Sequence, residues 1–165
     1  MNELTTFLTM RTRLREFGES LSEEQLFQIP KGFQNNIAWN LGHIAVTQQV
    51  LCYKLSGLEL VIDEGYLPSF SQGTSPADWA APPDMGRVLP LLTELAERFV
   101  EDHRAGRFRS FTPYVTLAKV ELRTLQEAVQ FNQMHEGMHL GYALAQRRAL
   151  GSAGAPGPSE PELEP

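Results

Sequence analysis

The chain has 165 residues, of which 42% are hydrophobic and 21% are charged, with a formal net charge of −6. This length and apolar content fit one domain that buries its own core. The acidic balance argues against nucleic acid as a partner, because nucleic-acid-binding faces concentrate Lys and Arg. Two short arginine clusters, at positions 11–15 and 104–109, are expected to be solvated helix faces or helix ends.

The single cysteine, Cys52, excludes an intrachain disulfide bond, as is typical of a reducing compartment. The first residues mix charges into their apolar positions and resemble no secretory signal. No apolar run reaches the roughly 20 residues of a membrane-spanning helix. We therefore expect a cytoplasmic protein with no membrane partner, in which Cys52 is a small buried hydrophobe rather than a nucleophile.

Apolar residues recur at helical spacing in four long segments, which predicts four long helices. Asn35 or Asn36 can cap the second helix, and Thr124 can cap the fourth in a capping box with Glu127. Gly151 is the expected left-handed stop of the last helix. The predicted helices span residues 2–19, from the asparagine cap to 54, 84–103 and 124–150.

The connections between these helices differ in character. A short helical turn, capped by Ser22, is predicted between the first two helices. Residues 58–83 form a long loop whose aromatic side chains should pack across the helices rather than float in solvent. Residues 105–123 can be extended or helical. From Gly151 onward the composition turns to Gly, Pro and Glu, so we predict a domain over 1–150 and a disordered tail over 151–165.

The placement of the four histidines is the most informative feature of the sequence. His135 and His139 stand one turn apart on the fourth helix, on a stripe that should face the interior. His43 lies on a similar inward stripe of the second helix. Imidazoles at this spacing can bind one ion at about 2.0–2.1 Å, and a third from a neighbouring helix leaves positions open for water or substrate.

An ordinary structural role is the competing interpretation of each histidine. One inward histidine is more often a satisfied core residue than a ligand. Two histidines on one core stripe are harder to explain in that way, because each needs its own buried partner. The sequence therefore predicts a metal site formed by His43, His135 and His139. His103 lies near a helix end in a charged stretch, where the helix dipole accounts for it.

Residues 135–139 also spell H-E-x-x-H, the zinc-protease motif in which the glutamate is the general base. Zinc proteases of this type take a third metal ligand from a residue after the motif. Here the only acidic residues after it lie in the predicted disordered tail, so that third ligand is missing. Glu136 points about 100° away from His135 on a helical wheel. It stays a candidate catalytic base, with an exposed residue or a supporting group beside the metal as alternatives.

Two segments carry a resemblance to a known family. The segments NNIAWNLGHIAVTQQVL and TLQEAVQFNQMHEGMHLGYALAQRRALG resemble the DinB-like (DinB/YfiT-like) metalloenzyme superfamily, and the layout is similar over about residues 1–150. The resemblance implies an all-α fold, a four-helix bundle with an up-down-down-up layout and long connecting loops, and a homodimer. It also implies a histidine triad, here His43, His135 and His139, that binds a divalent metal. Zinc or nickel is expected first, and iron or manganese next.

Three functions fit these observations. The first is a metal-dependent transferase that presents a low-molecular-weight thiol of the bacillithiol or mycothiol type to a small-molecule electrophile, as the resemblance implies. The second is a metal-dependent hydrolase with Glu136 as base. The third is a non-catalytic, metal-binding stress-response module. No organic cofactor is predicted.

Four neighbours of the histidines have open roles. Asn132 and Tyr142 share the histidine stripe and can either hydrogen-bond a ligand or serve as satisfied core groups. Trp39 and Phe131 are expected in the core rather than as a platform for substrate.

Overall fold

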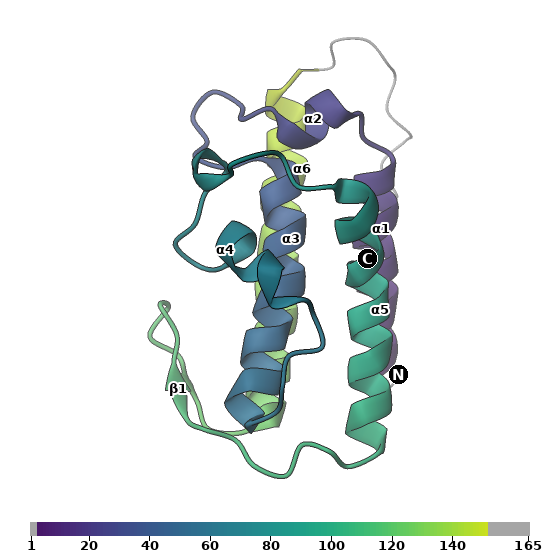
Figure 1. Cartoon of the computed structure of the whole chain (residues 1–165), viewed down its shortest axis with the longest axis vertical. Coiled ribbons are helices and arrows are strands. Elements are labelled where there is room, and N and C mark those ends of the chain that lie inside the picture. Colours follow the sequence, from purple (N-terminus) through teal and green to yellow (C-terminus); the bar gives the residue numbers. More distant parts are fainter. Residues whose placement is uncertain (1–2, 152–165) are drawn as a thin grey trace, which may run out of the picture.

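The computed structural model describes residues 3–151, and the predicted tail lies outside the described residues except for Gly151. The all-α prediction is confirmed, because the described chain is mostly helical (Figure 1). Its α-helices are α1 (Glu3–Glu19), α2 (Glu23–Phe27), α3 (Ile37–Gln48), α4 (Leu67–Phe70), α5 (Met85–Arg104) and α6 (Leu125–Ala149). Its strands are β1 (Tyr114–Val115) and β2 (Glu121–Leu122).

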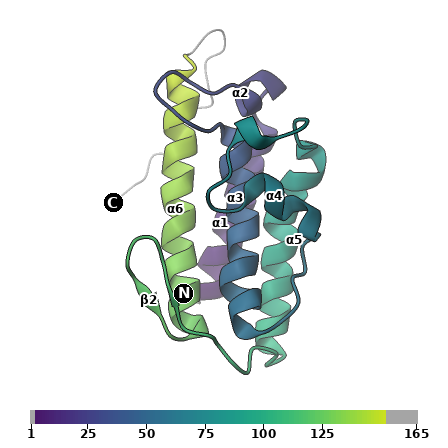
Figure 2. The same cartoon turned by 60° about the vertical axis from the view of Figure 1, so that its left-hand side comes forward.

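The long helices α1, α3, α5 and α6 lie side by side along the longest axis of the molecule (Figures 1 and 2). The chain runs toward the α2 end in α1 and α6, and away from it in α3 and α5. Helix α5 packs against both α1 and α3, and α3 packs against α6. Within residues 3–151 no helix combines the length and the apolar character needed to cross a membrane.

The helix boundaries follow from local capping. Asn36 accepts a hydrogen bond from the backbone nitrogen of Trp39 at 2.8 Å, and Thr124 closes a capping box with Glu127, so both predicted caps are confirmed. Gly151 has a φ of 80°, the left-handed stop predicted for α6. These groups pair backbone atoms that a helix end otherwise leaves unsatisfied.

The second predicted helix is not one continuous α-helix. Its α geometry ends with α3, and a π turn (Gln49–Tyr53) and a 3₁₀ turn (Lys54–Ser56) follow. The side-chain oxygen of Gln49 accepts a hydrogen bond from the backbone nitrogen of Val61 at 2.8 Å, which ties the π turn to the loop that follows. Gly57, with a φ of 73°, then ends the helical segment.

Both long connections have defined structure. In residues 58–83, α4 packs against α3, and Phe70 is buried, as the aromatic content predicted. In residues 105–123, the undecided stretch is extended: β1 and β2 pair antiparallel, with Tyr114 opposite Leu122. Lys119, with a φ of 62°, forms the turn of this hairpin.

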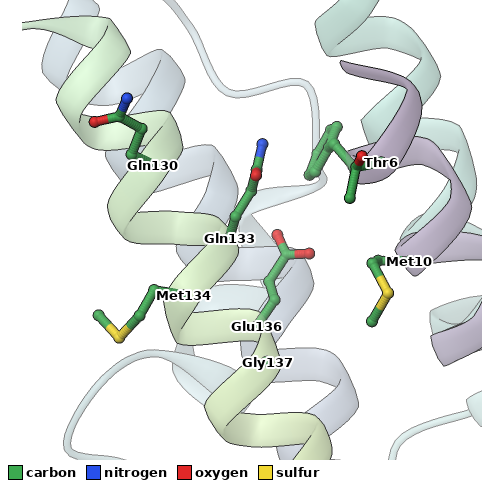
Figure 3. Close-up of a pocket in the computed structure, with 8 residues that line it drawn as sticks. Thr6, Met10, Gln130, Gln133, Met134, Glu136 and Gly137 are labelled. Carbon is green, nitrogen blue, oxygen red and sulfur yellow. The ribbon is translucent and has the colours of Figure 1, made fainter. Parts of the chain in front are cut away.

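Helices α1 and α6 border a cavity of about 410 Å³, where Thr6 and Met10 face Gln133 and Glu136 (Figure 3). Arg11 of α1 was expected in a solvated cluster, and this prediction is wrong. Its guanidinium is fully buried and donates to both carboxylate oxygens of Glu136, at 2.9 and 2.7 Å. A buried charge requires such a partner, because leaving either ion unpaired away from water is costly.

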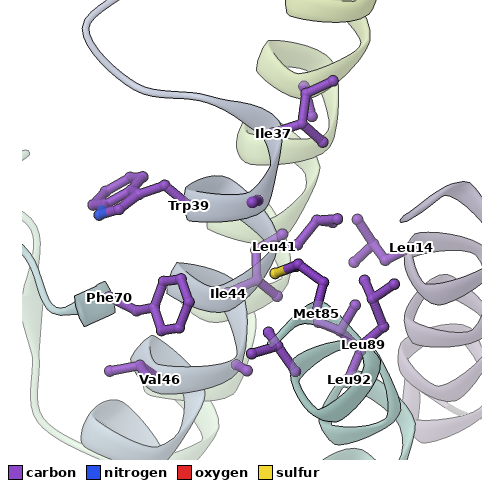
Figure 4. Packing of buried hydrophobic residues seen from close by; sticks show 14 of the residues in the cluster. Leu14, Ile37, Trp39, Leu41, Ile44, Val46, Phe70, Met85, Leu89 and Leu92 are labelled. Carbon is purple, nitrogen blue, oxygen red and sulfur yellow. The ribbon is translucent and has the colours of Figure 1, made fainter. Parts of the chain in front are cut away.

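The main hydrophobic core lies where α1, α3 and α5 meet (Figure 4). Leu41 and Ile44 of α3 pack there against Leu14 of α1 and against Leu89 and Leu92 of α5. Each of these side chains is buried, and full burial of such a side chain contributes about 1.5–3 kcal/mol. This core anchors one side of α3, whose other side carries His43 toward α6.

Candidate metal centre

The structure brings the three predicted histidines together between α3 and α6. His43 comes from α3, and His135 and His139 come from successive turns of α6. One nitrogen from each imidazole lies within 4.8 Å of the other two. The ring centroids are 4.4 Å apart for His135 and His139, and 4.8 Å apart for His43 and His139.

Hydrogen bonds fix which nitrogen faces the centre. The Nδ1 atom of His43 lies 2.7 Å from the carbonyl oxygen of Phe70, and that of His139 lies 2.7 Å from the side-chain oxygen of Asn40. Because both oxygens only accept, each Nδ1 carries the proton and donates. The Nε2 lone pairs of His43 and His139 are thereby left free to bind an ion.

The orientation of Asn40 is itself fixed by a network of amides. Its nitrogen donates to the backbone oxygen of Asn36 and to the side-chain oxygen of Gln146, both at 2.9 Å. Gln146 in turn donates to the backbone oxygen of Asn35 at 2.6 Å. With its nitrogen occupied in this way, Asn40 can only turn its oxygen toward His139.

Burial keeps the imidazoles neutral. Loss of solvation lowers the pKa of His43, and it lowers the pKa of His135 to about 4 and that of His139 to about 3, with the neighbouring histidines adding to the effect in the latter two. A neutral imidazole with a free lone pair is the form that binds metal. At neutral pH the site therefore presents uncharged nitrogen donors.

The three histidines fit a divalent metal on their own chemistry. The Nε2 atoms of His135 and His139 lie 3.1 Å apart. The Nδ1 atom of His135 is buried, and no hydrogen-bond partner for it exists among the described residues. Neither neutral form of His135 satisfies all of these atoms. If Nε2 carries the proton, the buried Nδ1 lone pair has no partner. If Nδ1 carries it, the Nε2 lone pairs of His135 and His139 point toward each other. A cation bound by the Nε2 atoms relieves that second arrangement, and imidazole suits zinc, nickel and iron alike.

The histidines open onto a cavity of about 520 Å³. The hydroxyl of Thr47 lies 3.2 Å from Nε2 of His43 at the edge of this cavity. Phe131 of α6, expected in the core, is half-buried against the core cluster around Leu51 and Leu122 and also lines the cavity. Leu117, in the turn between β1 and β2, lines it as well, although the side chain is 74% exposed.

Two of these cavity residues had a usable sequence signal. Thr47 follows His43 by one helical turn, so it shares the inward face of its helix. Phe131 precedes His135 by one turn in the same way. Leu117 had no such signal, because nothing local indicates that the 105–123 connection reaches the histidines.

Glu136 lies away from the histidine cavity. Both of its carboxylate oxygens accept from Arg11, one also accepts from the side-chain nitrogen of Asn132, and the side chain is 4% exposed. It borders the cavity between α1 and α6 rather than the one that the histidines line. A base must reach the proton it removes, so this placement speaks against Glu136 as a catalytic base.

The remaining candidates are distributed around the centre. Trp39 is buried in the core, as predicted, and stacks on His43 with ring centroids 4.5 Å apart and planes 11° apart. Asn132 is buried beside Glu136, whereas Tyr142 is 42% exposed and lies outside the predicted interior stripe.

Two further residues lie outside the site. Burial raises the pKa of the Cys52 thiol to about 12, which agrees with a hydrophobic rather than a nucleophilic role. His103 is exposed and contacts Phe108.

Fold and site together define a mostly helical protein with a cluster of three histidines that can hold a metal ion. The sequence model of the DinB superfamily matches residues 6–143. The chain therefore belongs to the DinB superfamily, which confirms the resemblance seen in the two histidine segments. A comparison with curated proteins gives no match.

Proposed function

We propose that this protein is a metal-dependent thiol transferase that uses a low-molecular-weight thiol of the bacillithiol or mycothiol type. The observation that carries the proposal is the opening of three neutral histidines onto a cavity of about 520 Å³. A purely structural metal site is closed by protein ligands, whereas a catalytic site keeps a position for water or substrate. Membership of the DinB superfamily supports the same assignment.

His43, His135 and His139 would hold the ion, with zinc or nickel expected before iron or manganese. When bound there, a divalent ion supplies a Lewis acid that lowers the pKa of a thiol. The protein's own groups do the rest. The Phe70 carbonyl and the Asn40 amide oxygen orient two of the imidazoles, and apolar side chains line part of the cavity in which the sulfur would react.

The transfer itself needs no redox partner. The thiol sulfur forms a bond to an electrophilic carbon, and the bond from that carbon to its leaving group breaks. The leaving group departs with the electron pair, and the thiol proton passes to solvent. An attacking sulfur reacts as the thiolate, so a site that favours the deprotonated form accelerates this step.

Conjugation of thiols to monochlorobimane tests the proposal. Protein loaded with zinc or nickel should form the fluorescent thioether from cysteine or bacillithiol and release chloride. His139→Ala should reduce the rate by at least about 100-fold, since loss of one ligand removes the ion-dependent activation. His103→Ala is the matched control, because it removes an exposed histidine outside the cluster and should leave the rate unchanged. Conjugation that persists unchanged in His139→Ala removes the proposal.

Metal analysis addresses the site separately from the reaction. Gently purified protein should carry close to one equivalent of a divalent metal, and His43→Ala should carry much less. If metal is bound but broad substrate screens stay blank, and chelation lowers the melting temperature, the non-catalytic binding module is the better description. The hydrolase alternative is less well supported, because its candidate base, Glu136, is paired with Arg11.

Three further properties are proposed from the sequence and its resemblance to the superfamily. We propose that α1, α3, α5 and α6 form the up-down-down-up four-helix bundle of the superfamily, which the directions of the helices in Figure 1 support. We also propose that the protein is a homodimer in the cytoplasm. Sedimentation velocity over a range of concentrations tests the assembly state directly.

A further inference from the structure

The histidine cavity carries an unusual charge for this chain. Among the described residues that line it, Lys54 has the only charged side chain, because the histidines are neutral, and neither Asp nor Glu contributes to the wall. The chain as a whole has a net charge of −6. A cavity that excludes carboxylates from its wall and includes a lysine is suited to an anionic ligand.

Lys54 and His43 stand on the same side of one helical segment. Lys54 follows His43 by eleven positions, beyond α3 and the π turn, and both residues line the cavity. Val46 and Val50 lie between them in the sequence and also line the cavity. The lysine therefore lies at the far end of an apolar strip that starts at the metal centre.

Apolar side chains of α6 and of the hairpin also line the cavity, beside polar ones such as Tyr114 and Thr116. Phe131 and Met138 of α6 line it, and Leu117 closes part of it from the hairpin. Leu117 is 74% exposed and Met138 is 57% exposed. Large apolar side chains exposed around a cavity mark a binding surface, because an apolar ligand removes them from water.

The Lys54 ammonium has no partner within residues 3–151. Its side chain is exposed, and no carboxylate of the described chain forms an ion pair with it. Seven arginines of the described chain do pair with an acidic side chain: Arg11, Arg13, Arg15, Arg87, Arg98, Arg107 and Arg123. Lys54 is therefore free to meet a charge that the ligand brings.

From this arrangement we infer that the substrate is an elongated amphipathic anion. One end carries the atom that approaches the histidines, the middle is an apolar stem along Val46 and Val50, and the other end is an anionic group at Lys54. The inference rests on the proposed metal site and adds the class of molecule that enters it.

Binding of hydroxamates tests the inference without requiring turnover. Hydroxamates bind divalent metals through two oxygens, so linear hydroxamates that end in a carboxylate serve as probes of the metal-to-lysine distance. Calorimetry on zinc-loaded protein should give an affinity that passes through an optimum as the alkyl stem lengthens. At the optimum, the carboxylate should bind about fivefold more tightly than the matched carboxamide, the upper range for an exposed ion pair.

The variants separate the lysine from general charge effects. Lys54→Met keeps much of the apolar stem and should abolish the preference for carboxylate over carboxamide. Lys31→Met removes the same charge from an exposed position outside the cavity and should preserve the preference. Equal binding of carboxylate and carboxamide by the unaltered protein overturns the inference.

The outcomes also separate this inference from the proposed function. A lysine-dependent preference together with no thiol conjugation supports the ligand class and removes the transferase. Thiol conjugation with no preference for anionic probes supports the transferase and removes the proposed ligand class. Protein that binds no divalent metal removes both.

Discussion

The side-chain oxygen of Asn40 lies 2.7 Å from Nδ1 of His139 and holds that imidazole with Nε2 toward the other two histidines. The two residues are 99 positions apart in the sequence. The contact therefore joins α3 to α6 at the candidate metal centre. We expect the metal affinity to depend on Asn40, although Asn40 is not one of the three candidate ligands.

Asn40→Ala removes this acceptor and should weaken zinc binding by about 10–100-fold, the usual effect of losing a group that orients a ligand. Competition with a coloured chelator measures the change. Asn40→Asp is the informative comparison, because it retains an acceptor oxygen for His139 but loses the donor to Gln146. It should retain metal affinity better than Asn40→Ala while melting at a lower temperature than the unaltered protein. Equal zinc affinity in Asn40→Ala and the unaltered protein would contradict the orienting role.

The metal-free protein should lose stability as the pH falls below about 6.5. Folding lowers the pKa of His135 to about 4 and that of His139 to about 3, from an ordinary value of 6.5. The unfolded chain therefore takes up protons first, and the stability that is fully present above 6.5 is lost progressively toward pH 4 and below.

Urea unfolding of metal-free protein between pH 7 and pH 4 measures this loss, with unfolding coupled to uptake of about two protons from the two histidines. Other acidic groups also titrate in the lower part of the range. The double variant His135→Gln with His139→Gln isolates the histidine contribution, because it keeps the rest of the chain and should show a shallower slope. Identical slopes in the two proteins would mean that these imidazoles are not held neutral.

Much of the fold could be predicted because its determinants are local. The caps at Asn36 and Thr124, the left-handed Gly151 and the spacing of His135 and His139 each depend on a few neighbouring residues. The meeting of His43 with the other two histidines is a tertiary contact. It could be predicted because the helical spacing placed His43 on the inward face of one helix, and His135 and His139 on the inward face of another.

The rest depends on contacts between distant parts of the chain. Arg11 stands in a charged run that looks solvated. Its burial is explained by distant partners: the carboxylate of Glu136, 125 residues away, and the backbone oxygens of Ile44 and Leu92. The Phe70 carbonyl reaches His43 because the long loop folds back on α3, and no spacing rule indicates that approach. The sequence does not predict that the β1–β2 hairpin lines the cavity, because this is also a contact between distant parts of the chain.

The Arg11–Glu136 pair should be costly to break and inexpensive to replace. Arg11→Met leaves a carboxylate that is 4% exposed without its partner, and this should destabilise the fold by about 3–5 kcal/mol. The double variant Arg11→Met with Glu136→Leu should recover most of that loss, since apolar side chains often substitute for a buried ion pair. Urea unfolding of the single and double variants measures the coupling. Retained zinc binding in the double variant would further separate Glu136 from the metal chemistry, whereas a double variant as unstable as Arg11→Met would contradict the account.

Gly42 precedes His43 and lets the Phe70 ring approach α3. A Cβ atom at this position would lie 2.4 Å from two atoms of that ring. Gly42→Ala should therefore cost about 1–3 kcal/mol through overpacking. Because the same Phe70 supplies the carbonyl that orients His43, zinc affinity should fall as well.

Gly137→Ala is the matched control for Gly42→Ala. It is also a glycine inside a helix, but a Cβ there would meet nothing within 4 Å. It should stabilise the protein by about 0.5–1 kcal/mol, because alanine loses less conformational freedom than glycine on entering a helix. Denaturant midpoints and chelator competition on both variants test the comparison. If Gly42→Ala retains its zinc affinity while losing stability, the Phe70 ring moves without disturbing His43, and the expected link between this packing contact and the metal site is wrong.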